Sequence, residues 1–283
     1  MNFKKVHQDF GIEIKDIKIN KINHEEITEI INLFEEYSLI VLKNQKITDE
    51  EQLDFAKNFG ELEVTKPGTI GSNSNLVILT NMDEDGKVVD HSHKQAKNDR
   101  ANQQWHSDSS FKIHPAHASI LNGRTTPKIG GSTQFICMRN IYKRLDQSIQ
   151  KQLDNLDAIH HFAYSRSKVD SSMVSQIELD KFPPVIHPMV KINPVNNKKA
   201  VYFGSHTKSI KNIDGDESSK LLRYLNDFIN NEDYIYSHKW NDFDLIIWDN
   251  RSMLHRGQPY DITEPRYLVR ATVSDSMSAG TYL

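Results

Sequence analysis

From Leu76 onward the sequence is divided into short strand-like runs separated by turn residues, and this pattern restricts the possible folds more than any other feature. The runs cover Leu76–Thr80, 118–122, Thr133–Cys137, 189–192, 200–203, 245–248 and 267–273. Strand-like runs at such spacing are typical of a sandwich or a barrel. Two interruptions, at 141–156 and 218–230, have helical character. The pattern predicts a mainly β fold with flanking helices, of the jelly-roll kind.

The amino-terminal part follows a helical pattern instead. Apolar residues recur at the spacing of one helix face across His24–Tyr37, which predicts a helix there. A short buried strand is expected at Leu39–Leu42, and Thr48-Asp49-Glu50-Glu51 is a capping box that predicts the start of a second helix, closed by Gly60. Because barrels of this length are commonly one domain, we expect residues 1–283 to form a single domain.

Charge and composition exclude several classes of partner. The formal net charge is −3 with no long basic block, so no nucleic acid is expected as a partner, and no apolar run approaches the ~20 residues that a membrane helix needs. The amino terminus has no signal-peptide pattern, and Cys137 is the only cysteine, so no intrachain disulfide is possible. We expect a cytoplasmic protein, a homo-oligomer, with a small-molecule substrate.

The run that begins at Arg266 carries two arginines on one side. Side chains alternate between the faces of a strand, so Arg266 and Arg270 share a face, while the opposite face, with Val269 and Ala271, is apolar. If the apolar face packs on other protein, the arginine face is open to solvent or lines a cavity. In a cavity, a desolvated guanidinium needs an anionic partner. The sequence therefore predicts an anion clamp.

A candidate metal site is formed by His106-Ser107-Asp108 together with the distant His255. A His-x-Asp pair in an extended segment puts an imidazole and a carboxylate on the same side, and a further histidine completes a facial triad that leaves one side of the metal free. The motif alone is weak, because His7-Gln8-Asp9 has the same spacing. His91-x-His93 and His114-x-x-His117 are further pairs that could bind metals.

The residues around these motifs carry a more specific signal. The stretches Asn102 to Phe111, Gly130-Gly131-Ser132-Thr133 and Leu254-His255-Arg256-Gly257 resemble the taurine dioxygenase family of iron(II) and 2-oxoglutarate-dependent oxygenases, and the similarity covers most of the chain. The resemblance implies a double-stranded β-helix (jelly roll) and iron held by His106, Asp108 and His255. It also implies hydroxylation of a small substrate, coupled to oxidative decarboxylation of 2-oxoglutarate.

The resemblance also assigns residues to the co-substrate. Arg266 stands where the family has the arginine that binds the far carboxylate of 2-oxoglutarate, and a planar guanidinium suits that task. Thr133 stands where the family has a hydroxyl donor to the same carboxylate, and Trp248 would line the pocket. Without a functional role, Thr133 is a strand threonine and Trp248 a core aromatic.

For the substrate, Arg270 stands where the family holds the acidic group, unless it pairs with a protein carboxylate such as Asp261 or Glu264. Asn102 resembles a substrate-contacting asparagine, and its alternative is a loop cap. Thr65-Lys66-Pro67-Gly68 replaces a histidine and a tyrosine of the taurine enzymes, which puts taurine in doubt.

The match is better to the phenoxyacetate enzymes at Asp85-Gly86-Lys87, where a family lysine lies near the substrate carboxylate. Lys66 and Lys87 therefore favour a carboxylate substrate, although a turn lysine is usually solvated. Phe162 and Phe203 could wall an apolar substrate. Three segments, 67–74, 91–102 and 165–181, are expected to cover the site.

The expected substrate is thus a small anionic acid of the aryloxyacetate type, with ether cleavage after hydroxylation. Two alternatives stay open at this point. One is a sulfonate or alkyl sulfate dioxygenase of the same family. The other is a zinc hydrolase that uses His106, Asp108 and His255 to activate water, although a hydrolase would not need the anchor at Arg266 for a 2-keto acid.

Overall fold

The structure is a computed structural model that describes residues 1–65, 74–90, 99–170 and 174–283. Lys66, and most of the segments 67–74 and 91–102 that were expected to cover the site, lie outside these residues. None of the helices in the described ranges combines the length and the apolar composition that a bilayer-spanning helix needs. The fold is mainly β with helices, as the spacing of the strand-like runs predicts.

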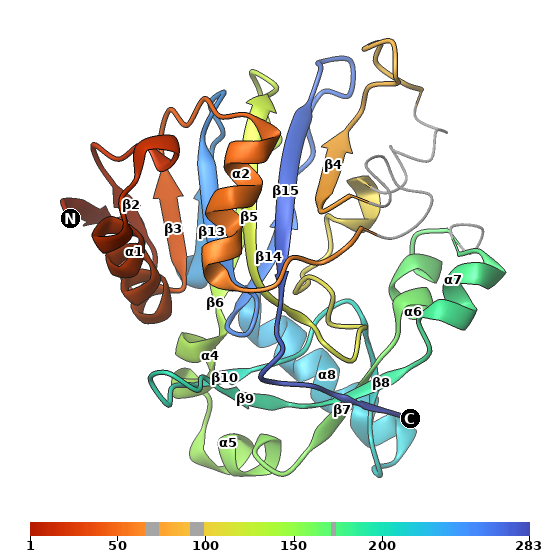
Figure 1. The fold of residues 1–283 in the computed structure, drawn as a ribbon. Coiled ribbons are helices and arrows are strands. Elements are labelled where there is room, and N and C mark those ends of the chain that lie inside the picture. Colours follow the sequence, from red (N-terminus) through yellow and green to blue (C-terminus); the bar gives the residue numbers. More distant parts are fainter. Residues whose placement is uncertain (66–73, 91–98, 171–173) are drawn as a thin grey trace.

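A seven-stranded sheet forms the largest layer (Figure 1). In sheet order its strands are β1 (Phe3–Lys5), β2 (Ile12–Ile14), β3 (Leu39–Leu42), β13 (Leu245–Asp249), β5 (Ala116–Thr125), β15 (Tyr267–Ser274) and β4 (Leu76–Thr80). Strands β2 and β3 are parallel, and the other neighbours are antiparallel. From β3 onward, strands from the first and the second half of the chain therefore alternate in the sheet.

The remaining strands form three smaller sheets. The three-stranded sheet contains β12 (Ile235–His238), β6 (Thr133–Cys137) and β14 (Met253–Gly257). The four-stranded sheet contains β11 (Thr207–Ile210), β7 (Asp157–His160), β8 (Val185–Pro188) and β16 (Thr281–Tyr282), and β10 (Lys199–Val201) pairs with β9 (Val190–Ile192). The pairing of β6 with β14 places Thr133 opposite Gly257 and Phe135 opposite His255.

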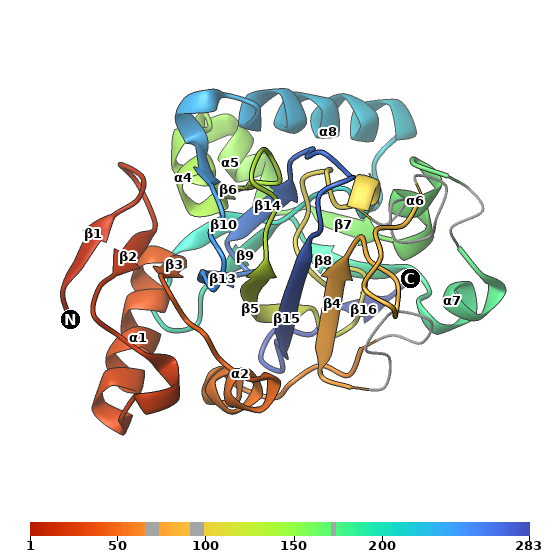
Figure 2. The same cartoon turned by 90° about the horizontal axis from the view of Figure 1, so that it is seen from above.

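Helices cover the outside of these layers. They are α1 (His24–Tyr37), α2 (Asp49–Ala56), α4 (Met138–Arg144), α5 (Gln147–Leu153), α6 (Phe162–Ser167), α7 (Gln176–Lys181), α8 (Gly215–Ile229) and the 3-10 turns η1 (Ile19–Lys21), η2 (Lys57–Phe59) and η4 (Glu232–Tyr234). Seen from above, α1 and α2 lie on one side of the large sheet, and α8 lies beyond the smaller sheets on the other (Figure 2).

Two hydrophobic clusters flank β15, as its alternation predicts. Val269, Ala271 and Val273 pack in one cluster with residues of α1 and α2. Leu268, on the opposite face, packs with Phe135 of β6 and with Trp248 in the second cluster, between the large sheet and the three-stranded sheet. The arginine face of β15 therefore points toward the space between the two sheets, where the candidate site lies.

The local predictions agree well with the amino-terminal elements. The helix at His24–Tyr37, the strand at Leu39–Leu42 and the capping box at Thr48 are confirmed. The expected helix at 141–156 is instead two helices, because Leu145 and Asp146, at the N-cap position of the second helix, leave the helical conformation. The Gln150 side chain donates to the Leu145 carbonyl at the break. The segment 165–181 contains the end of α6 and all of α7 in its described part.

Candidate active site

The three predicted metal ligands meet at the edge of the three-stranded sheet. His106 and Asp108 lie in the segment that precedes β5, and His255 lies in β14. The two histidines exchange backbone hydrogen bonds of 3.0 and 2.9 Å, in the manner of an antiparallel bridge. This pairing brings their rings to a centroid distance of 4.2 Å. Long-range backbone pairing, and not sequence spacing, sets the geometry of the pair.

Asp108 completes a compact donor set. One possible ligand atom from each of the three residues lies within 4.8 Å of the others. Nε2 of His106 is 4.0 Å from Oδ1 of Asp108, and Nε2 of His255 is 3.8 Å from Oδ2. Nδ1 of His106 lies 2.7 Å from the Gln104 carbonyl, which makes Nδ1 the protonated nitrogen and leaves Nε2 with a free lone pair.

A buried hydrogen-bond network fixes the Asp108 carboxylate. The Asn250 side-chain oxygen accepts from the Asp108 amide at 3.0 Å, and its amide nitrogen donates to the Ser119 hydroxyl at 2.9 Å. Ser119 in turn donates to Oδ2 of Asp108 at 2.7 Å. Because an amide has both donor and acceptor atoms, Asn250 can orient the backbone and the side chain of Asp108 together.

Burial and charge keep all three residues in the form that binds a metal. Burial lowers the pKa of His106 and of His255 below the usual range, so both imidazoles are neutral. Burial alone would raise the pKa of Asp108, but the charge of Arg270, helped by the hydrogen bond from Ser119, outweighs burial and holds that pKa low. Two neutral imidazoles and one carboxylate are ligands that suit Fe(II) with open positions.

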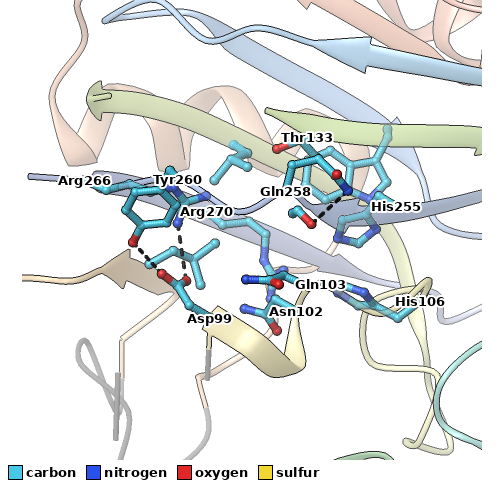
Figure 3. A pocket seen from close by; sticks show the side chains of 14 residues that line it. Asp99, Asn102, Gln103, His106, Thr133, His255, Gln258, Tyr260, Arg266 and Arg270 are labelled. Carbon is cyan, nitrogen blue, oxygen red and sulfur yellow. Dashed lines mark hydrogen bonds and ion pairs between the residues drawn. The ribbon is translucent and has the colours of Figure 1, made fainter. Parts of the chain in front are cut away.

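A pocket beside the triad contains both predicted arginines (Figure 3). Arg266, Tyr260 and Asp99 lie at one end of it, and His106 and His255 at the other. Its lining includes the predicted residues Asn102, Thr133, Trp248, Arg266 and Arg270. The structure thus gathers in one cavity predicted residues that are spread from position 102 to position 270 of the sequence.

The Arg266 end of the pocket is suited to a carboxylate. Arg266 is 7% exposed, and its guanidinium lies 5.4 Å from the centre of the Tyr260 ring. Thr133 is 4% exposed, and its hydroxyl oxygen accepts a hydrogen bond of 3.0 Å from the Trp240 indole. An indole N–H can only donate, so the Thr133 hydroxyl keeps its own hydrogen for a ligand.

Arg270 pairs with the triad itself. Its Nη1 donates to Oδ1 of Asp108 at 2.5 Å, so the partner is neither Asp261 nor Glu264. Asp261 instead accepts from Thr263, and Glu264 accepts from the amide of Lys128. Nε of Arg270 is buried and has no partner among the described residues. A second cation therefore lies next to the proposed metal position.

Three other predicted substrate residues, Lys87, Phe162 and Phe203, lie outside this pocket lining. Lys87 is exposed in the turn that Asp83 and Gly86 form. Phe162 is buried in a cluster with Phe111 and Phe182. Phe203 is buried in the cluster that contains Trp105 and Leu254. Lys66 is outside the described residues.

Sequence reasoning missed several residues of the site. Asn250 and Tyr260 stand in segments that the resemblance covers, and a polar residue directly after a buried strand is a signal that could have identified Asn250. No local signal marks Asp99, Ser119 or Trp240, because their partners are more than ten positions away in the sequence. Only the packed structure shows these contacts.

Comparison with known proteins decides the family. The model of the taurine catabolism dioxygenase TauD, TfdA family matches residues 2–272. The chain belongs to this family. An alpha-ketoglutarate-dependent 2,4-dichlorophenoxyacetate dioxygenase of Cupriavidus pinatubonensis is 33% identical over 95% of this chain and 96% of its own length. The (S)-phenoxypropionate/alpha-ketoglutarate-dioxygenase of Sphingobium herbicidovorans is 29% identical over 97% of this chain and 95% of its own length.

A solved structure extends the TauD/TfdA likeness to three dimensions. The structure of AAD-2 in complex with Mn(II) and N-oxalylglycine superimposes with a TM-score of 0.91 at 32% identity, and covers 98% of this chain and 100% of that one. The chain is therefore a 2-oxoglutarate-dependent dioxygenase, and it uses Fe(II), 2-oxoglutarate and O2. The donor set at His106, Asp108 and His255 fits such a metal in number, charge and spacing.

Proposed function

We propose that this dioxygenase hydroxylates a small carboxylic acid of the aryloxyacetate type and thereby cleaves its ether. The observation that carries the proposal is the Arg270 guanidinium, which lies in the pocket and touches Asp108 at the triad. A substrate anion held by Arg270 would place its neighbouring carbon close to the metal. The relatives named for 2,4-dichlorophenoxyacetate and phenoxypropionate act on acids of this shape.

Each residue of the pocket has a role in this proposal. His106, Asp108 and His255 hold the iron, and Arg266 and Thr133 hold the far carboxylate of 2-oxoglutarate, beside Trp248. Arg270 and Asn102 face the substrate. The bound Fe(II), 2-oxoglutarate and O2 supply an oxidation in which one oxygen atom enters succinate and the other the substrate. The β layers that carry these residues would form the jelly roll of a single domain, 1–283.

The chemistry of the product follows from the position of the hydroxyl group. Hydroxylation of the carbon between an ether oxygen and a carboxylate gives a hemiacetal. That hemiacetal breaks into a phenol or alcohol and glyoxylate, with no further oxidant. Lys66 and Lys87 remain candidate contacts to the substrate carboxylate. The homo-oligomeric state, the cytoplasmic location and the absence of a nucleic-acid partner also stay predictions.

A substrate panel tests the proposal. Phenoxyacetate-like acids should support O2 uptake better than taurine, alkyl sulfates or simple carboxylates, and should release glyoxylate in step with succinate. The sulfonate alternative is represented by a relative in Saccharomyces cerevisiae that is 26% identical and named an alpha-ketoglutarate-dependent sulfonate dioxygenase. Preferential sulfite release from taurine would therefore overturn the carboxylate assignment.

The ligand assignment predicts the behaviour of a matched set of variants. His106→Ala, Asp108→Ala and His255→Ala should each lose Fe(II) binding and the weak visible band that forms with Fe(II) and 2-oxoglutarate without O2. His7→Ala is the control, since His7 has the same spacing to Asp9 but contacts the Asp233 carbonyl far from the pocket. A full visible band in Asp108→Ala, or its loss in His7→Ala, would contradict the assignment.

A further inference from the structure

A protein carboxylate already lies at the end of the pocket where the co-substrate carboxylate is expected. Oδ1 of Asp99 is 3.4 Å from Nη1 of Arg266, and Oδ2 accepts a hydrogen bond of 2.6 Å from the Tyr260 hydroxyl. Both contacts are drawn in Figure 3. The Tyr260 ring lies against the same guanidinium. Asp99 is therefore held by two groups of the pocket wall.

The contact to Arg266 is weak enough to be exchanged. Charge-assisted hydrogen bonds between a guanidinium and a carboxylate are usually about 2.7–2.9 Å long and often bidentate. Here one bond of 3.4 Å is present, and the buried Nε of Arg266 has no partner among the described residues. The guanidinium has unused donors, and a ligand carboxylate that reached them would meet the negative charge of Asp99 at close range in a low-dielectric pocket.

We propose that Asp99 competes with the far carboxylate of 2-oxoglutarate for Arg266 and so sets the affinity and specificity of the co-substrate site. This inference rests on the proposed role of Arg266. A 2-keto acid with a second carboxylate must displace Asp99, whereas a keto acid without one leaves the Asp99–Arg266 pair in place. Asp99 thus weakens the binding of 2-oxoglutarate but not that of pyruvate.

The geometry allows Asp99 to leave while the neighbouring backbone stays. The Asn102 carbonyl accepts a hydrogen bond of 2.9 Å from the Gly257 amide, and the Gln103 amide donates to the Arg100 carbonyl. These bonds hold the end of the segment against β14. The Asp99 side chain is 17% exposed, so rotation can bring its charge into water without unfolding the segment.

The test is the sign of the change in binding, measured by calorimetry on the Mn(II)-loaded protein with 2-oxoglutarate and with pyruvate. Asp99→Asn should bind 2-oxoglutarate about three- to tenfold more tightly. In the wild-type protein only the molecules whose Arg266 is released from Asp99 can bind the far carboxylate, and the apparent affinity falls in proportion to that fraction. The affinity of Asp99→Asn for pyruvate should not rise. Tyr260→Phe, which keeps Asp99 and the ring but removes the hydroxyl that holds the carboxylate, should change affinity in the same direction by a smaller factor.

Asp261→Asn is the control for loss of one negative charge, since Asp261 is exposed and accepts a hydrogen bond from the Thr263 amide. This variant should leave the affinities for 2-oxoglutarate and for pyruvate unchanged. If Asp99 serves instead to orient Arg266, Asp99→Asn will bind 2-oxoglutarate more weakly, and the inference is wrong. Equal tightening of pyruvate would likewise overturn it. If Arg266→Ala binds 2-oxoglutarate as tightly as the wild-type protein does, Arg266 does not bind the co-substrate. The proposed function of Arg266 is then wrong, whatever Asp99 does.

Discussion

At the scale of single residues, the orientation of one hydroxyl illustrates how the pocket is prepared for its ligand. Thr133 is buried, and its oxygen accepts from the Trp240 indole at 3.0 Å. Trp240 itself is 8% exposed and packs closely on Gly123. The Thr133 hydroxyl has no acceptor among the described residues, so its hydrogen is available to a carboxylate at Arg266. Trp240 therefore acts through Thr133 as a positioning residue.

This arrangement predicts the outcome of a double-mutant cycle. Trp240→Phe keeps an aromatic side chain but removes the indole N–H, and should weaken 2-oxoglutarate binding by about 1 kcal/mol, or roughly fivefold, with kcat unchanged. Thr133→Val should have an effect of at least that size. In the Thr133→Val background, Trp240→Phe should have no further effect. Additive losses in the measured Kd would show that Trp240 acts on the fold and not through Thr133.

At the scale of elements, the strand β15 and the residue just before it supply both anion-binding groups. Arg270 of β15 and Arg266, which directly precedes this strand, line the pocket, while Val269 packs in the core with residues of α2. The alternation of side chains was readable in the sequence because it depends only on strand geometry. The break between α4 and α5 was not, since apolar spacing is similar on both sides and the end of α4 depends on the Gln150 side chain.

The two arginines should have separate functions although they line the same pocket. Arg266→Ala should raise the 2-oxoglutarate concentration needed for turnover, and Arg270→Ala should raise that for the prime substrate. Loss of a buried charge-assisted contact costs about 2 to 5 kcal/mol, so each effect should exceed roughly thirtyfold in apparent KM. Steady-state kinetics with each substrate varied in turn measures the split. A shift in 2-oxoglutarate alone for both variants would remove Arg270 from the substrate site.

At the scale of the whole molecule, long-range pairing determines what the sequence could not predict. The strand-like runs were visible locally, but the order in which β13 enters between β3 and β5 depends on contacts about 120 to 200 positions apart. The triad was predicted from residue types and a family resemblance. The networks through Asn250 and Asp99 were not, because hydrogen-bond partners brought together by folding leave no periodic pattern in the sequence.

A buried charge network joins the helical layer to the site. Arg251 donates to Glu35 of α1 at 2.8 Å and to Asp249 at 2.8 Å, and Arg139 of α4 donates to the same aspartate at 2.8 Å. All four side chains are at most 10% exposed. Asp249 directly precedes Asn250, which orients Asp108. The network therefore supports the metal site as well as the packing of α1 and α4.

Removal of one partner from this network should destabilise the protein strongly. Arg251→Met leaves Glu35 and Asp249 buried without their main cation, a change that should lower the free energy of unfolding in urea by about 3–5 kcal/mol.

The same network predicts a dependence of stability on pH. Burial alone would raise the pKa of Glu35 and Asp249, but their partners hold it below the value in the unfolded chain. The stabilisation is thus complete above about pH 4 and is lost as the pH falls further. Arg251→Met should therefore unfold in acid at a higher pH than the wild type. Lys57→Gln, which breaks an exposed pair with Asp54, is the control and should change neither measurement. Equal unfolding free energies for Arg251→Met and the wild type would show that the network contributes nothing to stability.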